Sequence, residues 1–142
     1  MKLKTTAPSA STARSLQPRS CIAILGVPFD SVTMQEAVDL IEGMIVSRRP
    51  HFLATANVDF VVQAVEDDEL RRILFDAHLV VCDGAPLMWA SRWLGNALPE
   101  RVSGADLVPL LLRLAADRNH RVYFLGGQPE VTARAIQNLE RD

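Results

Sequence analysis

Cysteine is scarce in this chain, with only Cys21 and Cys82 among its 142 residues. The two lie far apart and belong to no C-x-x-C or Cys/His pattern, so the sequence indicates neither a disulfide framework nor a zinc site. An excess of one charge is also missing, because 15 basic and 17 acidic side chains leave a net charge of −2. Binding to nucleic acid calls for a clustered basic face, and we therefore expect no nucleic-acid partner.

Long apolar runs are missing as well. The lysines near the N-terminus are not followed by the roughly 7–15 apolar residues of a secretory signal, and no run approaches the roughly 18 that cross a bilayer. Hydrophobic residues nevertheless make up 49% of the chain, which is too many for a disordered protein. Unpaired thiols suit a reducing compartment. We therefore expect a soluble, intracellular, globular chain of about one domain.

Residues 1–20 differ in composition from the rest of the chain. Four of the 15 basic residues and none of the 17 acidic ones lie there, so the remainder carries 11 basic and 17 acidic residues, a net charge of −6. Organelle transit peptides have a similar composition, but this segment lacks their amphipathic periodicity. We predict a disordered N-terminal tail over 1–20 and one domain over 21–142.

From Cys21 onward, short apolar runs alternate with segments of helical periodicity. The apolar runs predict four strands, at Cys21–Val27, His51–Ala54, His78–Cys82 and Arg121–Leu125. Helices are predicted from the capping box Thr33–Glu36 to Arg48, over Val58–Phe75 with a break near Glu66–Glu69, from Pro86 to Leu94, after Ser103, and from Pro129. This alternation predicts an α/β layered fold with a largely parallel sheet. The last helix reaches Asp142 without a stop signal, so we expect the domain to be truncated at the C-terminus.

Ligands of open α/β sheets bind beyond the carboxyl ends of the strands. Three groups follow predicted strands there: Thr55-Ala56-Asn57, Asp83-Gly84 and Gly126-Gly127. Thr55 and Asn57 can simply cap the next helix, and Asp-Gly is a common turn dipeptide. A carboxylate in that position can also serve as a general base. The two glycines can cradle a phosphate through backbone N–H groups, although a glycine pair alone is a weak signal.

A further polar cluster, Glu100–Asp106, leads into a predicted helix. Arg101 can bind a diphosphate through two parallel hydrogen bonds, and Ser103 with Asp106 suits a helix cap. A surface pair of Arg101 with an acid is the structural alternative. Structural roles are expected for the remaining conspicuous side chains: three scattered histidines, Trp89 and Trp93 in the core or at an interface, and the core stripe Leu107–Leu114.

Four short motifs follow one another along the chain: T-x-N at Thr55–Asn57, V-V-C-D-G at Val80–Gly84, E-R-V-S-G-x-D-L at Glu100–Leu107 and Y-F-L-G-G at Tyr123–Gly127. Together, and in this order, they resemble the WecG/TagA/CpsF glycosyltransferases, glycosyltransferase family 26. The similarity extends from about Cys21 to Asp142.

The resemblance implies a Rossmann-like fold and an inverting transfer of a sugar, N-acetylmannosamine or a related hexose. The donor would be a UDP-sugar and the acceptor a polyprenyl-diphosphate-linked sugar, in cell-surface polysaccharide synthesis. It implies no cofactor and no metal, and the sequence contains no D-x-D motif. Asp83 falls on the family's proposed general base. The implied substrate-binding residues are Thr55, Asn57, Gly84, Arg101, Gly104, Asp106, Gly126 and Gly127.

The family's members act at the cytoplasmic face of the plasma membrane as peripheral proteins, and the resemblance implies self-association into a homo-oligomer. They continue beyond this last helix with a basic appendage that engages the membrane. A non-catalytic nucleotide-sugar-binding or regulatory fragment is therefore the alternative function. A dinucleotide-dependent oxidoreductase is a further alternative, but it requires G-x-G-x-x-G after the first strand, and Gly26-Val-Pro-Phe does not fit.

Overall fold

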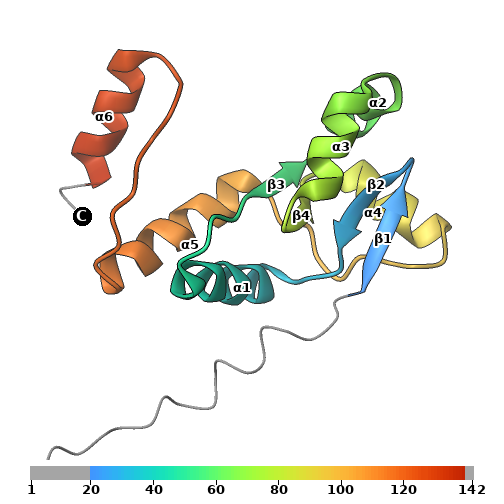
Figure 1. The fold of residues 1–142 in the computed structure, drawn as a ribbon, viewed down its shortest axis with the longest axis horizontal. Coiled ribbons are helices and arrows are strands. Elements are labelled where there is room, and N and C mark those ends of the chain that lie inside the picture. The colour runs from blue at the N-terminus through green and yellow to red at the C-terminus, as the bar shows by residue number, and fades with distance from the viewer. Residues whose placement is uncertain (1–19, 140–142) are drawn as a thin grey trace, which may run out of the picture. The chain divides into compact units, whose positions relative to one another are not determined.

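The structure is a computed structural model that describes residues 20–139 (Figure 1). The tail predicted over 1–20 lies outside the described residues except for Ser20. The chain divides into two units, the first ending at Leu110 and the second beginning at Leu111. None of the helices described between residues 20 and 139 combines the length and the hydropathy needed to cross a bilayer.

The first unit begins with an antiparallel hairpin of β1 (Cys21–Ile24) and β2 (Val27–Asp30). The prediction of one buried strand over Cys21–Val27 is therefore wrong. The chain reverses at Leu25 and Gly26, which have φ values of 49° and 86°. A two-residue turn with positive φ at both positions matches the twist of a hairpin, and Gly26 adopts it without steric cost. Leu25 is 66% exposed at the tip, and its apolar side chain conceals the turn in the sequence.

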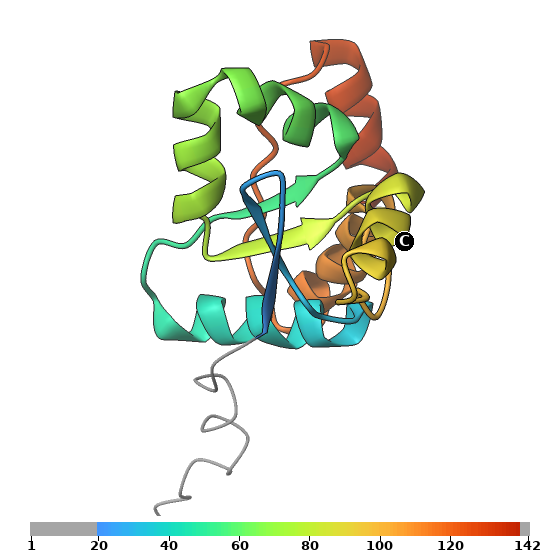
Figure 2. The same cartoon turned by 90° about the vertical axis from the view of Figure 1, so that its right-hand side faces the viewer.

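A parallel pair of strands forms the centre of the first unit (Figure 2). β3 (Leu53–Ala56) and β4 (Leu79–Cys82) pair in register from Leu53↔Leu79 to Ala56↔Cys82. The Asp30 carboxylate accepts a hydrogen bond from the Val80 N–H (2.8 Å) and so attaches the hairpin to β4. The unit is α/β and compatible with a Rossmann-like fold, but its parallel ladder is only two strands wide, smaller than the largely parallel sheet that we predicted.

The strand predicted at Arg121–Leu125 is also wrong, because these residues belong to no strand of the described chain. Tyr123 and Leu125 are 86% and 90% exposed. A strand exists only with a ladder partner, whereas β propensity reports the fit of side chains to a pleated surface. The apolar composition of the segment therefore predicts an extended chain, but it does not show whether another strand lies beside it to form the hydrogen bonds of a sheet.

The predicted helices are confirmed, with the expected break near Glu66–Glu69. Asp67 makes that break, since its carboxylate accepts hydrogen bonds from the Glu69 and Leu70 N–H groups and caps a new helix. The helices are α1 (Met34–Ser47), α2 (Val58–Glu66), α3 (Asp68–Asp76), α4 (Ala85–Trp93), α5 (Gly104–Asp117) and α6 (Pro129–Leu139).

The core of the first unit lies where β2, β4 and helices α2 to α4 meet, around Phe29, Leu74, Val80 and Leu87. Of the two positions predicted for Trp89 and Trp93, the core or an interface, the core position is wrong, because α4 buries its opposite side. The predicted core stripe Leu107–Leu114 is confirmed at Leu107, which is 1% exposed, but Leu110 is 38% exposed.

We expect Thr33→Ala to lower the free energy of unfolding by about 1 kcal/mol. The Glu36 carboxylate accepts hydrogen bonds from the Thr33 N–H (2.8 Å) and hydroxyl (3.0 Å), and these bonds lower the pKa of Glu36 below its ordinary 4.5. The stabilisation that the Thr33 hydroxyl contributes is fully present above the ordinary pKa of Glu36. It is lost as the pH falls through the lowered pKa of Glu36 in the folded chain. Urea unfolding should therefore give a lower free energy of unfolding for Thr33→Ala than for the parent chain at neutral pH. This difference should become smaller in acid.

Gln35→Ala provides the control, because it changes the same helical turn but removes only an exposed contact with Asp39. Equal losses of stability in the two variants at neutral pH would contradict the role of the cap.

Candidate functional site

The candidate site lies at the carboxyl ends of β3 and β4. Because these strands are parallel and in register, Asn57 and Asp83 emerge from the same edge of the sheet. The Asp83 N–H donates a hydrogen bond to the Ala56 carbonyl (2.9 Å), which extends the ladder by one step. The T-x-N and D-G motifs therefore meet at one edge, as the sequence predicts.

Gly104, the first residue of α5, also lies at the site. The Asp83 Oδ2 atom accepts a hydrogen bond from the Gly104 N–H (3.1 Å). A Cβ atom at Gly104 would lie 3.2 Å from the Thr55 Oγ1 atom, closer than ordinary van der Waals contact. Glycine thus permits the close approach of α5 to β3. Thr55, Asp83 and Gly104, from three separate elements, form the centre of the site.

Asp83 combines a fixed position with access to solvent. Its side chain is half-buried, and it is not enclosed in the core that covers Val80 and Cys82. The carboxylate stands at the N-terminus of α5, where the helix dipole favours a negative charge. It is therefore held in a charge environment that suits an anion, at a place that a ligand can reach.

The thiol beside this carboxylate is unsuited to nucleophilic chemistry. Burial and the negative charge of Asp83 raise the pKa of Cys82 to about 11, and a backbone hydrogen bond with Gly84 and the positive charge of Arg101 offset this only in part. A thiol with so high a pKa is protonated at neutral pH, and the thiolate is the reactive form. The Val102 N–H donates a hydrogen bond to the Cys82 carbonyl (2.9 Å), so the segment that carries Arg101 runs beside the end of β4.

Arg101 is held by Asp106 on the surface. Its Nη2 atom lies 3.1 Å from the Asp106 Oδ2 atom, and the two side chains are 50% and 58% exposed. The Ser103 hydroxyl donates to the same oxygen (2.5 Å) and accepts from the Asp106 N–H (3.2 Å), so the predicted cap is present as well. An exposed pair of this kind contributes only about 0–1 kcal/mol, and an anionic ligand can therefore replace Asp106 as the partner of Arg101 at little cost.

Asn57 and Gly84 contribute mainly to the shape of the site. The Asn57 side chain accepts a hydrogen bond from the Phe60 N–H (3.1 Å) and caps α2, which confirms the structural alternative for this residue. Thr55 does not cap that helix. Gly84 precedes α4, whose first turn has no side-chain cap, and so leaves backbone N–H groups of that turn near Asp83.

The glycine pair Gly126-Gly127 belongs to the second unit. It forms a turn ahead of α6, as predicted, with positive φ at both residues. The Thr132 hydroxyl donates to the Gly126 carbonyl (3.2 Å) and stabilises this turn. The structure thus groups seven predicted residues in the first unit, Thr55, Asn57, Asp83, Gly84, Arg101, Gly104 and Asp106, and leaves the glycine turn in the second.

Two residues that support the site were missed from the sequence. Glu100 accepts a hydrogen bond from the Met34 N–H (2.8 Å) at the start of α1, and so fixes the segment that carries Arg101. Ser91 is fully buried and accepts a hydrogen bond from the Leu98 N–H (3.1 Å), which holds the connection after α4. Glu100 lies within the E-R-V-S-G motif, but its partner is 66 residues away. Ser91 could have been found from the sequence as a polar residue on the same side of α4 as the buried Leu87 and Met88.

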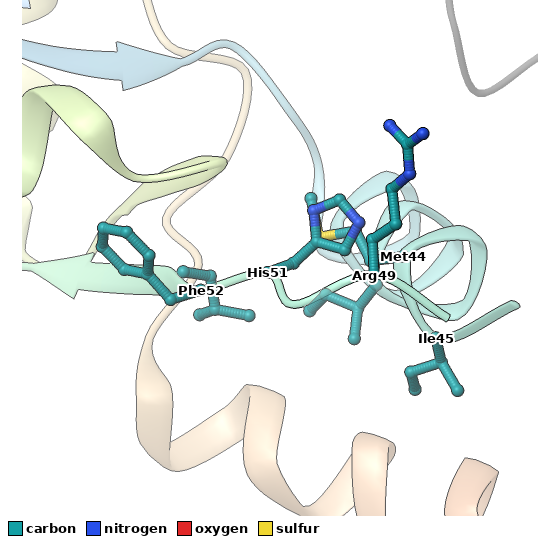
Figure 3. A pocket seen from close by; sticks show the side chains of 7 residues that line it. Met44, Ile45, Arg49, His51 and Phe52 are labelled. Carbon is teal, nitrogen blue, oxygen red and sulfur yellow. The ribbon is translucent and has the colours of Figure 1, made fainter. Parts of the chain in front are cut away.

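A cavity at the opposite end of β3 contains none of the predicted residues (Figure 3). It is lined by Ile41, Met44, Ile45, Arg49, His51, Phe52 and Leu53. Its volume is about 160 Å³, below the roughly 300–1,000 Å³ of typical ligand pockets. Between residues 20 and 139, no group of three or more His, Cys, Asp or Glu side chains is arranged to hold a metal ion.

Comparison with known proteins confirms the resemblance. Residues 22–142 match the model of the glycosyl transferase WecG/TagA/CpsF family. The chain is 30% identical over 122 residues to an N-acetylglucosaminyldiphosphoundecaprenol N-acetyl-beta-D-mannosaminyltransferase of Staphylococcus aureus, an alignment covering 84% of this chain and 48% of that protein. A protein of the same name from Bacillus spizizenii is 31% identical over 91 residues, which cover 64% of this chain and 35% of that protein.

The chain therefore spans about half the length, or less, of these curated relatives. The family match covers well over half of the chain and includes every motif that meets at the site. The chain belongs to the WecG/TagA/CpsF family of glycosyl transferases.

Proposed function

We propose that this chain takes part in transferring N-acetylmannosamine or a related hexose from a UDP-sugar to a polyprenyl-diphosphate-linked sugar. The names of its relatives describe an N-acetylmannosaminyl transfer to an N-acetylglucosaminyl-diphosphoundecaprenol. The observation that carries the proposal is the Asp83 carboxylate, which is fixed by the N–H of Gly104, the same residue that Thr55 closely approaches. Because the acceptor is lipid-linked, we place the reaction in cell-surface polysaccharide synthesis, with the chain as a peripheral protein at the cytoplasmic face of the plasma membrane.

Asp83 acts in this proposal as the general base. The acceptor hydroxyl donates a hydrogen bond to the carboxylate, and its proton moves to Asp83 as the oxygen attacks the anomeric carbon. The new C–O bond forms on the face opposite UDP while the bond from that carbon to the diphosphate oxygen breaks, so the configuration inverts. The Gly104 N–H holds Oδ2 and leaves Oδ1 as the proposed proton acceptor. General-base assistance of this kind contributes about 10²–10⁴ in rate.

The leaving UDP carries the electron pair of the broken bond, and its diphosphate needs positive charge or N–H donors. We assign that role first to Arg101, which can exchange its exposed partner Asp106 for two diphosphate oxygens. The uncapped first turn of α4 after Gly84 offers backbone N–H donors near Asp83. The Gly126-Gly127 turn is a further proposed phosphate contact, and Thr55 and Asn57 are proposed to contact the substrates.

We expect Asp83→Asn to reduce sugar transfer by about 10²–10⁴, because the amide keeps the shape and the hydrogen bond from Gly104 but cannot take up the proton. Binding of the UDP-sugar should remain measurable. Transfer is followed with a radiolabelled UDP-sugar and a lipid-diphosphate acceptor, and binding by calorimetry.

Asp76→Asn is the matched control, since Asp76 is an exposed acid at the end of α3, away from the site. Near-normal turnover of Asp83→Asn would remove Asp83 from the role of base. Binding of the UDP-sugar without any transfer by the parent chain would instead favour the alternative, a non-catalytic nucleotide-sugar-binding module.

We expect Arg101→Gln to weaken UDP binding by about tenfold or more, because a hydrogen bond to a charged group contributes about 1.5–3 kcal/mol. Arg72→Gln on α3 removes an exposed arginine of the same charge and should leave UDP affinity unchanged. Titration calorimetry with UDP measures both. Equal affinities of the two variants would exclude Arg101 as a diphosphate ligand.

A further inference from the structure

The solvent-facing side of α4 is unusually apolar. The helix buries Leu87, Met88 and Ser91 against the core. On its other side Trp89 is 57% exposed, Trp93 is 89% exposed, and Leu94, directly after the helix, is 57% exposed. Pro86, Trp89 and Trp93 follow helical spacing and therefore form one stripe. We call Pro86, Trp89, Arg92, Trp93 and Leu94 the α4 outer face.

This face has the wrong composition for contact with water alone. A helix on the surface of a globular protein normally has a polar outer side, and larger exposed apolar patches mark interaction sites. Among the helices described in residues 20–139, α4 alone contains no acidic residue, although the chain as a whole carries more acid than base. Its one charged side chain is Arg92, which is exposed. The outer face thus joins two indoles and a leucine with a positive charge.

Those residue types suit the surface of an anionic lipid bilayer. Indole rings gather at the boundary between hydrocarbon and water, because one end of the ring is apolar and its N–H finds a partner in the head-group layer. Arginine beside them is attracted by anionic head groups, and the absence of acid removes repulsion. Trp and Arg are also enriched at protein interfaces, so the test below includes a second copy of the chain as the outcome that would contradict a lipid partner.

The position of α4 connects this surface with the site. The helix begins immediately after Asp83-Gly84, and its nine residues extend about 13 Å from there. We propose that the α4 outer face binds an anionic lipid bilayer and thereby brings the Asp83 end of β4 to the surface in which a lipid-linked acceptor is anchored. This inference extends the proposed function by naming its lipid contact, and it rests on that function for the choice of a lipid partner.

Intrinsic fluorescence tests this directly, since Trp89 and Trp93 are the only two tryptophans of the chain. Vesicles of equal parts phosphatidylcholine and phosphatidylglycerol should shift the emission to shorter wavelength, and brominated lipids should quench it. Vesicles of phosphatidylcholine alone should bind more weakly. Trp93→Glu should reduce co-sedimentation with the anionic vesicles by about tenfold or more, because insertion of a large apolar side chain is lost and a negative charge is added.

Phe75→Glu is the matched control, because Phe75 is an aromatic side chain of α3 that is 69% exposed. It should bind vesicles like the parent chain, and circular dichroism checks that each variant is folded. Leu94→Ser provides a second, milder variant of the outer face with an intermediate expected loss. Asp83→Asn should bind vesicles normally, so a failure of the catalytic proposal is distinguishable from a failure of this one.

Three results would overturn the inference. The first is unchanged emission with anionic vesicles. The second is an equal loss of vesicle binding in Trp93→Glu and Phe75→Glu. The third is a tryptophan emission that is at shorter wavelength already without lipid and moves to longer wavelength when the protein is diluted. In this case sedimentation would also show a dimer, and Trp93→Glu would dissociate it. That result would assign the α4 outer face to a second copy of the chain.

Discussion

The hydrogen bond between the Gly104 N–H and the Asp83 carboxylate determines the geometry of the site. It joins the end of β4 to the start of α5 and leaves the carboxylate half-buried rather than enclosed. Two neighbouring contacts make it possible. The Val102 N–H donates to the Cys82 carbonyl (2.9 Å), so the chain before α5 runs beside the end of β4. The missing side chain of Gly104 lets Thr55 approach to contact distance. A bulkier residue there would separate β3 from α5 and release the carboxylate.

The long connection between α4 and α5 is held by contacts that lie outside the site itself. Ser91 binds it at Leu98, Glu100 ties it to the start of α1, and Ser103 with Asp106 closes it as a helix cap. Each such bond contributes only about 0.5–1.5 kcal/mol to stability, but together they restrict where Arg101 can stand. A mobile guanidinium would have to lose side-chain entropy on binding a diphosphate, whereas one already held by an exposed acid has lost part of it beforehand.

Local chemistry made much of this fold predictable. The predicted caps at Thr33 and Asn57 and the predicted helix break near Glu66–Glu69 are short-range patterns, and the structure contains each of them. The meeting of Asn57 with Asp83 was predictable too, because parallel strands end at one edge of a sheet. The contact of Asp83 with Gly104 was not, since it spans 21 residues and depends on the path of a loop.

The wrong predictions also arise where the structure depends on more than a local pattern. The hairpin was hidden because an exposed Leu25 occupies a turn position that is usually polar. The strand at Arg121–Leu125 failed because pairing is a property of two segments, whereas periodicity describes one. The prediction left the tryptophans of α4 either in the core or at an interface, because the helix is apolar on both sides and its sequence alone does not distinguish the side that packs from the side that faces outward.

The two adjacent side chains at the end of β4 narrow the chemistry that the site can perform. Cys82 would be the obvious nucleophile of a double-displacement reaction, but burial and the neighbouring carboxylate keep its thiol protonated. Asp83, by contrast, faces solvent in part and stands at the N-terminal end of a helix. In the proposed transfer, the reaction is a single displacement in which the Asp83 carboxylate takes up a proton and forms no covalent bond with the sugar. One displacement inverts the anomeric centre once, which is the stereochemistry of the proposed transfer.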